Sequence, residues 1–133
     1  YDNAIAYTDH VLARLIAFLD ARRDRFDVAM AYVSDHGESL GEHGLYLHGM
    51  PRAIAPREQF EVPMVWWMPA SSAGGLGVDL GCLKRRAAAT TPASHDHLYH
   101  SVLGLLGVQT PTYRSGLDLL SRCRTAPAHV AIK

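Results

Sequence analysis

The residues 28–49 read VAMAYVSDHGESLGEHGLYLHG, and this stretch decides the fold. Val28 to Ser34 is apolar at nearly every position, which is typical of a strand covered on both faces by helices. The run ends abruptly in Asp35, His36 and Gly37. Ligand sites in open α/β sheets lie at the carboxyl ends of strands, and a carboxylate oxygen and an imidazole nitrogen both bind zinc well. The stretch therefore predicts a metal site, although Asp also ends strands for turn reasons alone.

The rest of the chain alternates between helical and extended patterns. Asn3 to Ala21 carries apolar residues at helical spacing, and so does Ser94 to Leu106. Val62 to Met68 is a second apolar run and predicts a second strand. The glycine- and proline-rich segment Leu40 to Gln59 predicts a long irregular loop, and Pro69 to Gly81 predicts a flexible surface loop. Helices that alternate with buried strands indicate the α/β class.

Composition sets limits on the function. The chain has 133 residues, 48% of them hydrophobic and 20% charged, which suits one domain with a real core. Its formal net charge is zero, so nothing in the charge argues for binding nucleic acid. No apolar run approaches the roughly 18 to 20 residues that a bilayer-spanning helix needs.

Three segments carry a family resemblance. Ser34 to Glu42 resembles the Asp-His-Gly segment of the alkaline phosphatase and sulfatase superfamily. Tyr46 to Pro51 and Ala55 to Gln59 are more narrowly similar to the phosphoethanolamine transferases that modify lipid A, which include the mobile colistin-resistance enzymes. The similarity runs from Tyr1 to Arg124. It implies an α/β fold, the C-terminal part of an alkaline phosphatase/sulfatase-like sandwich with a central, mostly parallel sheet flanked by helices.

The resemblance also implies a chemistry. A zinc ion would be held by Asp35 and His36, together with a glutamate and a catalytic threonine that lie outside this chain. That threonine would attack the phosphorus of phosphatidylethanolamine, and the phosphoethanolamine would then pass to a phosphate of lipid A. The resemblance makes His48 a contact to the transferring phosphoryl group or a ligand of a second zinc, whereas the residues alone allow a loop histidine bonded to the backbone.

Other polar residues near this stretch are weaker candidates. Glu38 is expected to orient His36 or the loop backbone rather than to bind metal itself. Glu42 and His43 are adjacent possible ligands, but His43 stands where the family pattern has asparagine. Three further histidines at positions 95, 97 and 100 resemble a metal cluster, yet positions 95 and 97 do not share a helix face. We expect these three to be surface or capping residues.

The resemblance further implies a location and an extent. Residues 1–124 are expected to be the C-terminal portion of a sulfatase-like catalytic domain, and residues 125–133 a disordered tail. A membrane anchor upstream would hold the protein in a bacterial inner membrane, with the catalytic domain facing the periplasm. Cys82 and Cys123 would both be buried thiols in an intracellular protein. In the periplasm, where disulfides persist, the preferred interpretation is that they are paired, although two cysteines cannot prove this.

Two other functions remain open. A sulfatase or a phosphoglycerol transferase of the same superfamily would share the strand end but not the continuation from Tyr46 to Gln59. A non-catalytic fragment is the alternative of a different class. With half a ligand set, the 133-residue chain alone is expected to bind zinc weakly and to catalyse nothing.

Overall fold

The computed structural model describes residues 1–89 and 92–125 of the chain. These residues form two compact units. One contains Met30–Trp66, and the other contains Tyr1–Ala29 and the residues from Trp67 onward.

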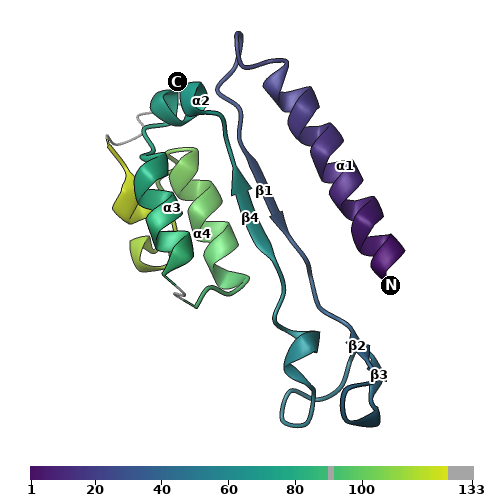
Figure 1. Ribbon diagram of the computed structural model, residues 1–133. Coiled ribbons are helices and arrows are strands. Elements are labelled where there is room, and N and C mark those ends of the chain that lie inside the picture. Colours follow the sequence, from purple (N-terminus) through teal and green to yellow (C-terminus); the bar gives the residue numbers. More distant parts are fainter. Residues whose placement is uncertain (90–91, 126–133) are drawn as a thin grey trace. The chain divides into compact units, whose positions relative to one another are not determined.

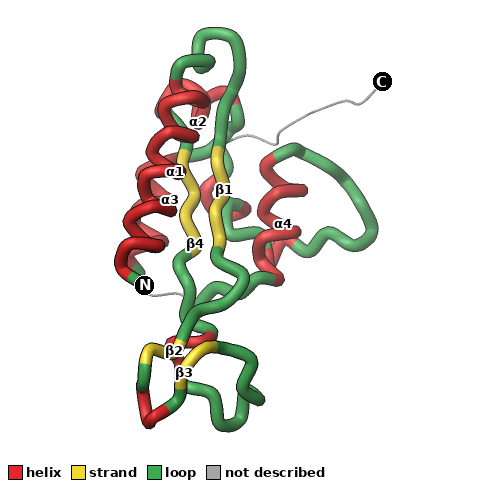
Figure 2. Tube along the Cα trace, turned by 90° about the vertical axis from the view of Figure 1, so that its right-hand side faces the viewer, coloured by secondary structure: helices red, strands yellow, loops and turns green. Residues whose placement is uncertain are grey.

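The unit Met30–Trp66 is built on a pair of strands, β1 (Met30–Val33) and β4 (Met64–Trp67). Figures 1 and 2 show them side by side, with their arrows in opposite directions in Figure 1. The Ser34 N–H donates to the Pro63 oxygen at 3.3 Å, which continues the pairing just beyond both strands. This pair is therefore antiparallel, whereas the sheet of the complete fold was expected to be mostly parallel.

Between β1 and β4 the chain makes an excursion at one end of the strand pair (Figure 2). It contains a short antiparallel hairpin of β2 (Ser39–Leu40) and β3 (Tyr46–Leu47), in which Ser39 faces Leu47 and Leu40 faces Tyr46. Two 3-10 turns accompany it, η1 (Glu42–Gly44) and η2 (Arg57–Gln59). The segment predicted to be irregular is thus mostly loop, with four very short elements.

The other unit is helical. It contains α1 (Asp2–Asp20), α2 (Ala70–Gly75), α3 (Leu80–Ala88), α4 (Asp96–Leu105) and the 3-10 turns η3 (Ser115–Leu117) and η4 (Ser121–Cys123). Its core is a set of small and medium apolar residues, namely Val28, Met68, Ala73, Val78, Leu105, Leu120 and Cys123. The helix α1 contributes no buried residue to it.

The prediction that residues 69–81 form a surface loop is wrong. They contain α2 and the start of α3. Ser72 and Ala73 are buried, and the Ser72 hydroxyl accepts the Val28 N–H at 3.0 Å. Small residues were read as a flexible loop, but here they allow α2 to approach its neighbours closely.

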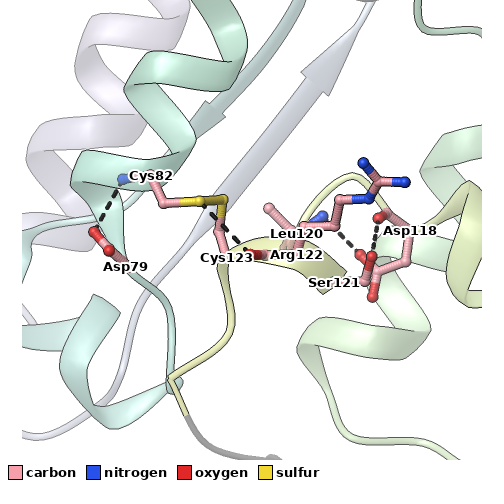
Figure 3. Close-up of a disulfide and its surroundings, with 7 residues drawn as sticks. All are labelled: Asp79, Cys82, Asp118, Leu120, Ser121, Arg122 and Cys123. Carbon is pink, nitrogen blue, oxygen red and sulfur yellow. Dashed lines mark hydrogen bonds between the residues drawn. A yellow bond between two sulfur atoms is a disulfide. The ribbon is translucent and has the colours of Figure 1, made fainter.

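A disulfide joins Cys82 on α3 to Cys123 on η4 (Figure 3). The Asp79 carboxylate caps α3 by accepting the Cys82 N–H at 3.0 Å, and the Asp79 N–H donates to the Cys123 oxygen at 2.8 Å. The chain after Cys123 continues along Gly77 to Asp79, where Thr125 N–H donates to the Gly77 oxygen at 2.9 Å. The C-terminal end of the described chain is therefore fastened to α3 both covalently and through its backbone. The tail predicted at residues 125–133 lies, from residue 126 on, outside the described residues.

Candidate active site

Asp35 and His36 follow β1 directly and are held by a local set of hydrogen bonds. The Ser34 hydroxyl donates to the His36 oxygen at 2.8 Å, and the His36 N–H donates to Asp35 Oδ1 at 3.0 Å. The Gly37 N–H then donates to the Gln59 oxygen at 2.9 Å. A Cβ on Gly37 would overlap the backbone oxygen of Glu58. The strand end is therefore fastened to η2 by a contact that only glycine allows.

The Asp35 carboxylate stays exposed, with 90% of its side chain accessible. The backbone N–H of His36, the backbone N–H of Asp35 and the nearby His36 imidazole all lower the pKa of the Asp35 carboxyl group. Because these groups stabilise the anion, Asp35 presents a charged oxygen to any ligand at the strand end.

The His36 ring is oriented by its neighbour. Its Nδ1 lies 2.9 Å from the Gly37 oxygen, which can only accept, so Nδ1 is the protonated nitrogen in the neutral ring. Nε2 then carries the free lone pair, and it lies 3.9 Å from Asp35 Oδ2. A backbone carbonyl that fixes the tautomer of a histidine is a regular feature of metal-binding imidazoles.

His48 lies against this pair. Its ring centroid is 3.9 Å from that of His36, with 30° between the planes. Its Nδ1 lies 3.3 Å from Glu38 Oε2. The sequence predicts that Glu38 orients His36 or the loop backbone, but in the structure this carboxylate contacts His48. The hairpin turn brings residues 38 and 48 together, and sequence spacing does not reveal that contact.

Gln59 also holds the loop that carries His36 and His48, and the sequence did not point to it. It is buried, its amide nitrogen donates to the Ser39 hydroxyl at 2.8 Å, and its amide oxygen accepts the Met50 N–H at 3.3 Å. Its backbone oxygen is the acceptor for Gly37. One buried amide side chain thereby connects the segments that carry His36 and His48.

Several other candidate residues accept hydrogen bonds from backbone N–H groups. Glu42 accepts the Leu40 N–H at 2.7 Å, and its own backbone N–H and that of Leu40 lower the pKa of its carboxyl group. The His97 Nδ1 accepts the Ser94 N–H at 3.0 Å, as expected of a capping residue. His100 is buried rather than on the surface, and its Nδ1 accepts the Arg114 N–H at 3.1 Å.

The donor set fits part of a zinc site. Asp35 and His36 offer a charged oxygen and a free imidazole nitrogen to the same side, and zinc takes such ligands, usually four of them. Among residues 1–89 and 92–125, no group of three or more His, Cys, Asp or Glu side chains gathers in a way that could hold a metal. The described residues therefore bring together no complete zinc-binding shell.

Comparison with known proteins decides the family. The model of the sulfatase family, described as Sulfatase, matches residues 1–108. The chain belongs to the sulfatase family.

Curated relatives narrow the similarity within the sulfatase family. The chain is 44% identical over 124 residues to the phosphoethanolamine transferase EptA of Salmonella typhimurium, which covers 93% of this chain. It is 57% identical over 67 residues, half of this chain, to the phosphatidylethanolamine transferase Mcr-1 of Escherichia coli. The chain spans only 22% of the length of the EptA relative and 12% of that of Mcr-1.

A solved sulfatase-family structure agrees with these relatives. The integral membrane protein lipooligosaccharide phosphoethanolamine transferase A of Neisseria meningitidis matches 95% of this chain with a TM-score of 0.88 and 44% identity, over 23% of its own length. The resemblance drawn from the residues is confirmed, and so is the α/β fold class. In the described part of this chain, no helix combines the length and apolar character that crossing a membrane requires.

Proposed function

We propose that the protein carrying this chain transfers phosphoethanolamine from phosphatidylethanolamine to lipid A. The observation that supports this most is the cluster at the end of β1, where Asp35, His36, His48 and Glu38 lie together on one short excursion of the chain. Relatives named as phosphoethanolamine transferases, which cover nearly the whole chain, support the same reaction.

In this proposal Asp35 and His36 hold a zinc ion. Zinc bound there would lower the pKa of a coordinated hydroxyl group and neutralise charge on the phosphoryl oxygens. Asp35 suits this role because it is already ionised, and His36 suits it because the Gly37 carbonyl leaves Nε2 free. The nucleophile is a threonine supplied from outside the 133 residues, and so are the remaining ligands.

His48 is proposed to contact the group that is transferred. Glu38 engages Nδ1 of His48, so Nε2 is the nitrogen available to substrate. An imidazole protonated at Nε2 would donate a hydrogen bond to a phosphoryl oxygen or a proton to the leaving group. The stacking on His36 positions this nitrogen beside the proposed metal ligands.

The proposed setting is the periplasmic face of a bacterial inner membrane, reached through an anchor outside this chain. The disulfide between Cys82 and Cys123 supports an oxidising compartment, because disulfides rarely persist in the cytosol. Both substrates in this proposal are lipids with phosphate groups in that membrane or in the envelope beyond it.

Mass spectrometry of lipid A from cells that express the protein at its full natural length tests this function. Wild type should add phosphoethanolamine, and Asp35→Ala, His36→Ala and His48→Gln should each abolish or strongly reduce the addition. His43→Asn is the matched control, since His43 is exposed in the same loop at a φ of 54° that asparagine also tolerates. Unmodified lipid A together with hydrolysis of an aryl sulfate would instead identify a sulfatase.

A further inference from the structure

Gln59 forms hydrogen bonds with two residues of the segment that follows β1. Its backbone oxygen accepts the Gly37 N–H at 2.9 Å, and Gly37 is next to His36 in the chain. Its amide nitrogen donates to the Ser39 hydroxyl at 2.8 Å, and Ser39 is next to Glu38. The main chain and the side chain of Gln59 therefore each fix a residue adjacent to a member of the candidate site.

The side-chain amide of Gln59 also bonds the segment that carries His48. Its oxygen accepts the Met50 N–H at 3.3 Å, and Met50 lies two residues after His48. Leu47, which directly precedes His48, is the cross-strand partner of Ser39. His48 therefore stands between two positions that are tied to Gln59, one of them directly and the other through the hairpin.

The bond between the Gln59 amide and the Ser39 hydroxyl is shielded from water, since Gln59 is 6% exposed and Ser39 is 2% exposed. An amide side chain holds a donor and an acceptor a fixed distance apart. The bonds to Ser39 and to Met50 therefore set the distance between the two segments that they join. All of these contacts lie within the compact unit Met30–Trp66.

We propose that Gln59 is a positioning residue for phosphoryl transfer, because its bonds set the spacing and direction of the His36 and His48 imidazoles. The centroids of the two rings are 3.9 Å apart, and each ring belongs to a segment that Gln59 holds. Gln59 acts through these rings rather than on the substrate itself. This inference rests on the proposed function, which gives the two imidazoles their roles.

Variants of the full-length protein test this with the water-soluble ester 4-nitrophenyl phosphoethanolamine. Gln59→Met fills a similar volume but forms neither side-chain hydrogen bond, so kcat should fall about a hundredfold, the cost of a misplacement of about 1 Å. KM should stay within about twofold, because binding of the ground state is unchanged. Gln59→Glu should recover most of the loss, since a carboxylate accepts from the Met50 N–H and from a rotated Ser39 hydroxyl. The control is Glu58→Gln, whose exposed side chain belongs to the same 3-10 turn and which should keep wild-type kcat and KM.

Crystal structures of the wild type and of Gln59→Met give a second measurement that does not depend on turnover. In the variant, the centroids of the His36 and His48 rings should lie farther apart than 3.9 Å, by a distance on the order of 1 Å. If Gln59→Met does not fold, Gln59→Asn replaces it in both measurements, because its amide is one methylene shorter and cannot reach both partners.

Three results would overturn the proposal: rings that keep their wild-type positions, a folded Gln59→Met with wild-type kcat, and a Gln59→Glu as slow as Gln59→Met. A raised KM at unchanged kcat would overturn it as well, because Gln59 would then serve the binding of substrate. If the wild type turns over neither the ester nor phosphatidylethanolamine, the proposed function fails, and the ring positions alone then decide the role of Gln59.

Discussion

Gly37→Ala is the sharpest test of how the site is held. Its added Cβ would overlap the Glu58 backbone oxygen, which belongs to η2 and cannot rotate away as a flexible side chain would. Either the strand end or η2 must move by a distance on the order of 1 Å, and a misplacement of that size at a reacting centre can cost about a hundredfold in rate. The movement also weakens the hydrogen bond from the Gly37 N–H to the Gln59 oxygen.

The stability cost follows from the same clash. Forcing an extra methyl group into a filled space costs about 1 to 3 kcal/mol, and a backbone obstacle places this substitution toward the upper end. Gly74→Ala is the matched control, because nothing lies within 4 Å of a Cβ at Gly74 in α2. Alanine is the better helix former by up to about 1 kcal/mol, so the control should be neutral or slightly stabilising.

Both variants are compared with wild type in the full-length protein, by denaturant unfolding and by turnover of a water-soluble ester, 4-nitrophenyl phosphoethanolamine. The reasoning predicts a lower free energy of unfolding and a rate about two orders of magnitude lower for Gly37→Ala only. A Gly37→Ala protein with wild-type stability and rate would show that the strand end is not fastened to η2 as described. Equal losses in both variants would show that any added methyl group harms the protein.

Three more contacts of the structure lead to predictions. Glu38→Gln should lower turnover, because an amide replaces the carboxylate that holds the His48 ring through Nδ1; wild-type turnover in this variant would contradict this. Cys123→Ser should lower the free energy of unfolding by about 4 kcal/mol, the chain-entropy value for a disulfide spanning 41 residues, and denaturant unfolding with and without reductant measures it. Burial, and after it the hydrogen bond that the Tyr113 hydroxyl donates to Asp118, raises the pKa of Tyr113. The stability that Tyr113 contributes is therefore present below the ordinary tyrosine pKa of about 10 and is lost as pH rises through the higher pKa of the folded state. Tyr113→Phe should flatten that alkaline decline in the free energy of unfolding, which denaturant unfolding at several pH values measures.

The sequence predicted the elements that have strong periodicity. The helix expected at residues 3–21 is α1, and the apolar runs at residues 28–34 and 62–68 contain β1 and β4. These patterns work because periodicity is a local property of the sequence, and it identifies α1 even though that helix buries none of its residues. The prediction of a loop at residues 69–81 was wrong because a run of alanine, serine and glycine indicates a loop by composition. In the structure these residues form α2, and Ser72 and Ala73 are buried in it.

The candidate site also has some features that the local sequence indicates and others that depend on the fold. Asp35 and His36 were candidates from the sequence because adjacent residues at a strand end need no long-range information, and their role as metal ligands stays a prediction. The contact between Glu38 and His48 and the bridging by Gln59 depend on the path of a glycine-rich loop, and local propensity does not fix that path. A buried glutamine whose amide bonds a hydroxyl on one side and a backbone N–H on the other is hard to predict, since most glutamines are exposed.

The excursion between β1 and β4 orders its histidines without a large core of its own. Its rings are held by backbone contacts, namely Gly37 to Gln59, His36 to the Gly37 oxygen, and Met50 to the buried Gln59 amide. Such a scaffold can fix the direction of two imidazoles and one carboxylate. It does not by itself hold a metal ion, because the described residues gather no group of three or more His, Cys, Asp or Glu side chains that could do so. The zinc chemistry proposed for this strand end would therefore need further ligands from outside the described residues, and the exposure of the Asp35 and His36 side chains leaves room for them.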